Sequence, residues 1–115
     1  PGAEALGPGF ELHEEWYSLK NFADDLHVVL VNETNKMQGK CYERPPYPAT
    51  WAHDYGKGHV FYTSMGHRED VWTTPEFQSV VVGGINWALG KTPADISPNI
   101  QRVTPQANVM PPKGK

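Results

Sequence analysis

A histidine followed by three charged residues, His67, Arg68, Glu69 and Asp70, comes directly after an apolar stretch of the chain. Gly66 lets the backbone turn sharply just before the histidine. In open α/β sheets ligands bind outside the carboxyl ends of the strands, where a general base or a metal ligand is useful. His67 is therefore a candidate catalytic residue. The competing interpretation is a structural histidine in a solvated turn, and the residues alone favour it.

The charges after His67 allow two interpretations. Adjacent opposite charges in a loop are usually solvated and contribute little to stability. Alternatively, Arg68 clamps a polar substrate, while Asp70 either contacts it or caps the next turn. Trp72 follows as a core or site-wall residue. We predict substrate contacts for Arg68, Asp70 and Trp72 if this stretch is a site.

A second polar cluster lies near the start of the chain, where Glu14 and Glu15 stand beside His13, Trp16 and Tyr17. Carboxylates accept hydrogen bonds from sugar hydroxyls, and aromatic rings pack on the apolar faces of sugars. A partly buried carboxyl group also serves as a general acid. Glu14 and Glu15 are thus candidate catalytic residues, with His13 and Tyr17 as substrate contacts. The alternative is an exposed turn anchored in the core by Trp16.

Metal and thiol chemistry find weaker support. Four of the five histidines, at positions 13, 53, 59 and 67, have no compact zinc-ligand spacing, and His53 and His59 are more simply cross-strand neighbours in a hairpin. We predict no metal-ligating residue, although a divalent metal such as zinc stays compatible with the sequence and the cofactor is unknown. Cys41 is the only cysteine, which excludes an internal disulfide.

Composition bounds the chain to one small domain of 115 residues with a net charge of −3. Its basic residues are scattered, which argues against a nucleic-acid partner. No apolar stretch approaches the roughly 20 residues that span a membrane. No signal-peptide pattern follows Pro1, so the location is left open between the cytoplasm and, after removal of a signal, the periplasm or the exterior.

The coarse pattern predicts few regular elements. Residues 25–33 form an apolar run of strand length without strict alternation, as expected of a strand buried on both faces. Residues 34–48 contain three prolines and predict a loop, and so long an irregular loop is usually functional or disordered. A glycine pair predicts a hairpin turn at Tyr55–Gly58, with the second strand running to about Thr63.

The clearest element is a helix from about Pro75 to Leu89, with Thr74 as N-cap. Its apolar spacing predicts a buried face of Phe77, Val81 and Ile85. Two glycines inside the helix cost about 1 kcal/mol each in propensity, which close packing on a sheet would offset. Residues 91–115 are Pro-rich and predict an extended tail. One helix cannot cover both faces of a sheet, so the tail, a homo-oligomer partner or further parts of the domain must cover the rest.

Two blocks carry a family resemblance: "RPPYPATWAHDYGKGHVFYTSMGHREDVWTTPEFQSVVVGGINWALG" (44–90) and "GFELHEEWYSL" (9–19). They resemble the C-terminal portion of a ThuA-like, trehalose-utilisation domain. The resemblance implies an α/β fold similar to class I glutamine amidotransferases, a mainly parallel flavodoxin-like three-layer sandwich. It also implies that residues 1–90 form a partial domain without its N-terminal βα units. Cys41 lies in a loop and matches no nucleophile of that fold.

The resemblance implies a carbohydrate substrate from trehalose or keto-sugar catabolism. We expect acid–base chemistry on a sugar or keto-sugar, by hydrolysis, elimination or isomerisation, with His67 as base and Glu14 or Glu15 as its partner. The residues leave two alternatives open, a non-catalytic sugar-binding or interaction module and a metal-dependent hydrolase. Whether the chain is an enzyme is therefore not decided by its sequence.

Overall fold

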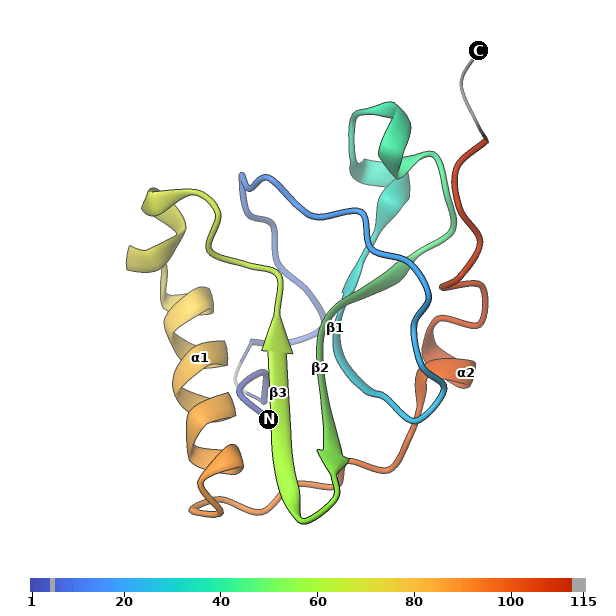
Figure 1. Ribbon diagram of the computed structural model, residues 1–115. Coiled ribbons are helices and arrows are strands. Elements are labelled where there is room, and N and C mark those ends of the chain that lie inside the picture. Colours follow the sequence, from blue (N-terminus) through green and yellow to red (C-terminus); the bar gives the residue numbers. More distant parts are fainter. Residues whose placement is uncertain (5, 113–115) are drawn as a thin grey trace.

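A computed structural model describes residues 1–4 and 6–112 and shows a small α/β domain (Figure 1). Its sheet has three antiparallel strands in the order β1-β2-β3. The strands are β1 (His27–Asn32), β2 (Tyr47–Tyr55) and β3 (Gly58–Thr63), and the helices are α1 (Pro75–Ala88) and α2 (Ile100–Val103). Three single 3₁₀ turns lie between them, η1 (Thr34–Lys36), η2 (Lys40–Tyr42) and η3 (Glu69–Thr73).

The predicted hairpin is confirmed. Tyr55 pairs with Gly58 at its end, and Gly56 has φ 59°, a left-handed conformation that favours glycine. Trp51 and Tyr62 stack across the two strands with ring centroids 4.2 Å apart.

The α/β class is also confirmed, but the flavodoxin-like sandwich is not. Every strand pair in the described part of the chain is antiparallel, whereas that sandwich is mainly parallel. The expectation that β1 is buried on both faces is wrong, because only Val28 and Asn32 of this strand are buried. β1 is an edge strand, and its register with β2 shifts on both sides of Leu30. This irregularity accounts for the missing alternation.

Helix α1 begins as predicted, with the Thr74 hydroxyl accepting a hydrogen bond from the Phe77 N–H at 3.3 Å. Its buried face differs from the prediction: Phe77 is buried but Ile85 is 53% exposed. The helix instead turns Gly84 to the sheet, where an added Cβ would lie 2.4 Å from the Phe61 ring. The glycine thus allows the close packing that was expected to offset its low propensity.

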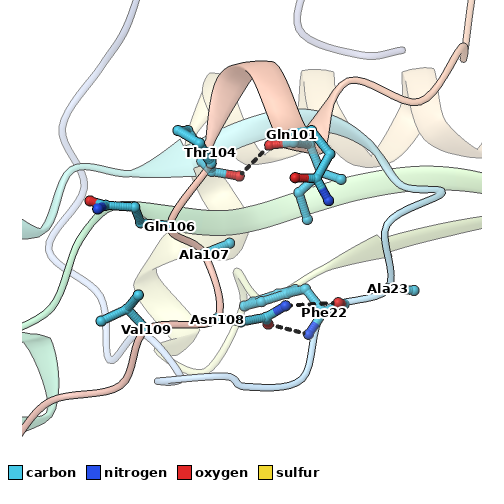
Figure 2. A pocket seen from close by; sticks show the side chains of 10 residues that line it. Phe22, Ala23, Gln101, Thr104, Gln106, Ala107, Asn108 and Val109 are labelled. Carbon is cyan, nitrogen blue, oxygen red and sulfur yellow. Dashed lines mark hydrogen bonds between the residues drawn. The ribbon is translucent and has the colours of Figure 1, made fainter.

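The segment after residue 90 is not a simple extended tail. It forms α2, and Ile100 and Ala107 enter a core cluster with Leu26, Val28 and Tyr47. A pocket of about 290 Å³ lies in this region. Figure 2 shows the residues that line it and the Asn108 amide, which accepts a hydrogen bond from the N–H of Phe22 and donates one to its C=O. The tail therefore covers part of the sheet. In the described residues, no helix has the length and apolar character needed to cross a bilayer.

Candidate functional site

The loop that follows β3 is held by the carboxylate of Glu14. One of its oxygens, Oε2, accepts a hydrogen bond from the Gly66 N–H at 2.7 Å. The other, Oε1, accepts from the N–H groups of Arg68 at 2.8 Å and Glu15 at 2.9 Å. Gly66 has φ 113°, a backbone conformation that residues with a side chain rarely adopt. Glu14 thus ties residues 9–19, here called the acidic segment, to the turn that carries His67.

These hydrogen bonds of Glu14, here called the clamp, hold the loop in which His67 lies beside the carboxylate of Glu15. His67 Nε2 lies 2.5 Å from Glu15 Oε2, and the Tyr17 ring approaches the imidazole edge-on with centroids 6.2 Å apart. The His67 side chain is 46% exposed and that of Glu15 is 70% exposed. Of the two candidate carboxylates, Glu15 contacts the histidine, and Glu14 holds the backbone around it.

Arg68 and Asp70 pair with each other. The guanidinium donates from Nε to Oδ1 and from Nη2 to Oδ2, both at 3.1 Å. The hydrogen bond from Arg68 lowers the pKa of Asp70, and His13 lies near enough to lower it slightly further. The same pairing raises the pKa of Arg68. Asp70 caps no helix, since Thr74 caps α1.

Trp72 forms one wall beside the loop. Its indole N–H donates to the Gly66 carbonyl at 3.0 Å, and its ring packs on Phe77 with centroids 4.9 Å apart. Both Trp72 and Tyr17 keep large exposed surfaces. Gly66 is therefore held from two sides, by Glu14 at its N–H and by Trp72 at its carbonyl.

Sequence reasoning missed the residues that hold the acidic segment on the side away from His67. Three side chains from the loop before β2 and the start of β2 donate to its carbonyls: Tyr42 to Trp16, Tyr47 to Tyr17 at 2.8 Å, and Arg44 to Leu19 at 2.5 Å. Arg44 is buried and lies over the Tyr47 ring, 4.0 Å from its centroid. Burial raises the pKa of Tyr47 to about 12. Long donor side chains in a Pro-rich loop were the only available signal.

The other polar candidates lie elsewhere. The expected pairing of His53 with His59 is wrong, because the strand register places Asp54 opposite His59, and His59 Nδ1 bonds Asp54 Oδ1 at 2.6 Å. Cys41 is exposed. Across residues 1–4 and 6–112, no three His, Cys, Asp or Glu side chains converge as a metal site requires.

His67 and Glu15 form a close contact between a ring nitrogen and a carboxylate oxygen. A neutral imidazole that donates its Nε2–H to a carboxylate keeps its Nδ1 lone pair for accepting a proton. In the described part of the chain, the His67 ring contacts Glu15 through Nε2, and the ring is partly open to solvent. A histidine in such a place is a candidate for accepting a proton from a bound ligand.

Comparison with known proteins gives one match. The model of the family described as "ThuA: Trehalose utilisation" matches residues 1–88, which include both the acidic segment and the His67 loop. No curated protein and no solved structure matches the chain.

Proposed function

The chain belongs to the ThuA, trehalose-utilisation family, and on that premise we propose that it performs acid–base chemistry on a sugar or keto-sugar with His67 as general base. The family supports a carbohydrate role related to trehalose utilisation. The observation that carries the proposed chemistry is the 2.5 Å contact between His67 Nε2 and Glu15 Oε2. A carboxylate in this place holds the imidazole in one tautomer and stabilises the imidazolium that forms.

In the proposed reaction on a keto-sugar, His67 Nδ1 accepts the C–H proton next to the carbonyl and leaves an enediolate. Return of the proton to the neighbouring carbon gives isomerisation, and loss of a leaving group from the next carbon gives elimination. In a hydrolysis the same nitrogen accepts a proton from the attacking water. Glu15 balances the positive charge on the ring in each case.

We assign Glu14 a positioning role, because both of its oxygens already accept backbone hydrogen bonds. The aromatic rings of Tyr17 and Trp72 provide surfaces for the apolar face of a sugar. His13 and the Arg68–Asp70 pair stand nearby as partners for hydroxyl groups.

Proton exchange tests this proposal directly. A keto-glucoside is incubated with the protein in D₂O, and loss of the proton next to the carbonyl is followed by NMR. We expect His67→Ala to slow the exchange at least about a hundredfold, and Glu15→Gln roughly tenfold. His53→Ala on β2 is the matched control and should keep the full rate. If His67→Ala exchanges as fast as the wild type, the proposed base is wrong.

A sugar-binding module is the second candidate, favoured by the openness of the pair, in which Glu15 is 70% exposed and His67 46% exposed. A catalytic base is usually shielded from bulk water, whereas a binding residue need not be. Saturable binding of trehalose, without proton exchange in the keto-glucoside and without turnover of either sugar, would favour this candidate. Loss of exchange in His67→Ala with retained binding would favour catalysis.

A further inference from the structure

An aromatic groove lies on the face of the sheet opposite α1. Phe61 faces α1, and successive residues of a strand point to opposite faces, so Tyr62 and its cross-strand partner Trp51 face the other way. On that side the chain before β1 crosses the sheet (Figure 1), and Phe22 meets the Trp51 ring edge-on with centroids 5.6 Å apart.

This groove has about the volume of a small-ligand site. The space between residues 19–23, Leu26, Trp51 and Tyr62 is about 360 Å³ and is partly open to solvent. Small-molecule pockets begin at roughly 300 Å³, so the space suits a single sugar ring better than a helix or a strand of a partner. Trp51 and Tyr62 are only partly buried, which leaves part of each ring open to the groove.

Two polar side chains at the rim of the groove are available to a ligand. The side chains of Lys20 and Asn21 make no hydrogen bond to the described residues, and both are exposed. An ammonium offers three donors, and an amide offers donors and an acceptor. Asn21 also has φ 60°, a conformation that few residues other than glycine adopt. Aromatic rings pack on the apolar face of a pyranose, and polar groups at one edge bind its hydroxyls, so the groove has the features of a pyranose site.

The groove and the His67–Glu15 pair are joined through Tyr17. Its ring lies beside His67 with centroids 6.2 Å apart, and its phenol is close enough to Tyr62 to raise the pKa of that residue, second to the effect of burial. Along the chain, Tyr17 is followed two residues later by Leu19, which lines the groove. Tyr17 is therefore the residue along which a ligand that spans both places would pass.

We propose that the groove walled by Trp51, Tyr62 and Phe22 is a subsite for a pyranose ring, from which a disaccharide or glycoside extends past Tyr17 to the His67–Glu15 pair. This inference rests on the proposed carbohydrate function and adds to it where the second ring is held. It selects two-ring or glycosidic ligands over free keto-sugars.

Glucose is the probe for the groove, because it is a single pyranose ring and His67 is not among the residues that line the groove. Binding is followed by the indole N–H resonances of ¹⁵N-labelled protein, with the Trp51 signal assigned from Trp51→Phe. We expect glucose to shift the Trp51 signal. Tyr62→Leu should weaken binding roughly three- to tenfold through loss of ring packing. Lys20→Met and Asn21→Gly should each weaken it by a similar factor, and glycine keeps the backbone conformation at position 21.

Two controls separate this subsite from the catalytic proposal. Tyr55→Ala removes an exposed aromatic ring at the hairpin turn and should bind glucose as the wild type does. His67→Ala should also bind glucose unchanged while losing proton exchange. If His67→Ala keeps its exchange, the catalytic proposal fails, and unchanged glucose binding still supports the subsite.

The subsite is overturned if glucose and trehalose leave the Trp51 signal in place at high concentration. It is also overturned if Tyr62→Leu, Lys20→Met and Asn21→Gly all bind glucose as the wild type does. A dimer in light scattering that Tyr62→Leu dissociates, together with absence of sugar binding, would assign the groove to an interface between two chains and overturn the proposal.

Discussion

Replacing Glu14 by glutamine is expected to loosen the loop that carries His67. The carboxylate accepts hydrogen bonds from the N–H groups of Gly66 and Arg68, which lie 52 and 54 residues away in the chain. Glutamine keeps one acceptor oxygen but turns its NH₂ group toward the other N–H donor. The carboxylate accepts three charge-assisted bonds, counting the one from the Glu15 N–H; at least one of them is lost, the others become neutral, and a donor is left facing a donor.

The size of the effect follows from these contacts. A hydrogen bond to a charged group contributes about 1.5–3 kcal/mol to stability, and partial exposure of Glu14 places it near the lower end. We therefore expect Glu14→Gln to lower the free energy of unfolding by about 2 kcal/mol. For a chain of 115 residues this corresponds to a fall in Tm of roughly 8 °C.

Thermal unfolding followed by circular dichroism measures the change, and Glu11→Gln is the matched control. Glu11 is an exposed acid of the same segment, and its side chain makes no hydrogen bond to the described residues. The Tm of Glu11→Gln should therefore stay within about a degree of the wild-type value. The NMR signals of the His67 ring should also move in Glu14→Gln. Equal Tm values for the two variants would refute the assigned clamp.

Three further predictions address packing and titration. Gly84→Ala should destabilise the chain by about 1–2 kcal/mol in urea unfolding, because its Cβ would press on Phe61 despite better helix propensity; equal or higher stability would contradict the packing. Because a hydrogen bond from Arg68 lowers the pKa of Asp70, the pair stabilises the fold above the ordinary Asp pKa and this is lost as the pH falls through the folded value. Asp70→Asn should therefore flatten the acid limb of stability against pH, and an unchanged limb would count against the pair. Burial raises the pKa of Tyr47 to about 12. The stability that the neutral phenol contributes is therefore present below the ordinary phenol pKa and is lost between roughly pH 10 and 12. Tyr47→Phe should flatten that alkaline limb and cost about 1 kcal/mol at neutral pH, whereas a limb as steep as that of the wild type would show that another group titrates.

Local signals predicted the parts of the fold that depend on local physics. The hairpin depends on a positive φ at Gly56, and the start of α1 on the hydroxyl of Thr74, and both can be recognised within four residues of sequence. The buried face of α1 could not be predicted as well. Periodicity gives an apolar stripe but not its centre, which is set by the approach of Phe61 to Gly84. Strand direction likewise depends on pairing partners that the pattern of one strand does not contain.

The candidate site divides in the same way. The types of residue in the acidic segment and in the His67 loop suggested sugar chemistry, and the family resemblance joined the two segments. Which carboxylate meets the imidazole was not predictable, because Glu14 and Glu15 are adjacent and equivalent in sequence. The structure distinguishes them by the backbone: Glu14 faces the N–H groups of the turn, and Glu15 faces His67.

Residues 34–48, predicted as one loop, contain two 3₁₀ turns and the first two residues of β2, and they have a larger part in the site than their composition indicated. The acidic segment has no regular secondary structure, so its backbone carbonyls need partners from elsewhere in the chain. Tyr42, Arg44 and Tyr47 supply those partners while Glu14 supplies the opposite contact to the His67 loop. The acidic segment is thus held on both sides without belonging to the sheet. An irregular loop of this length is expected to be functional or disordered, and here its function is to fix the segment that carries Glu15.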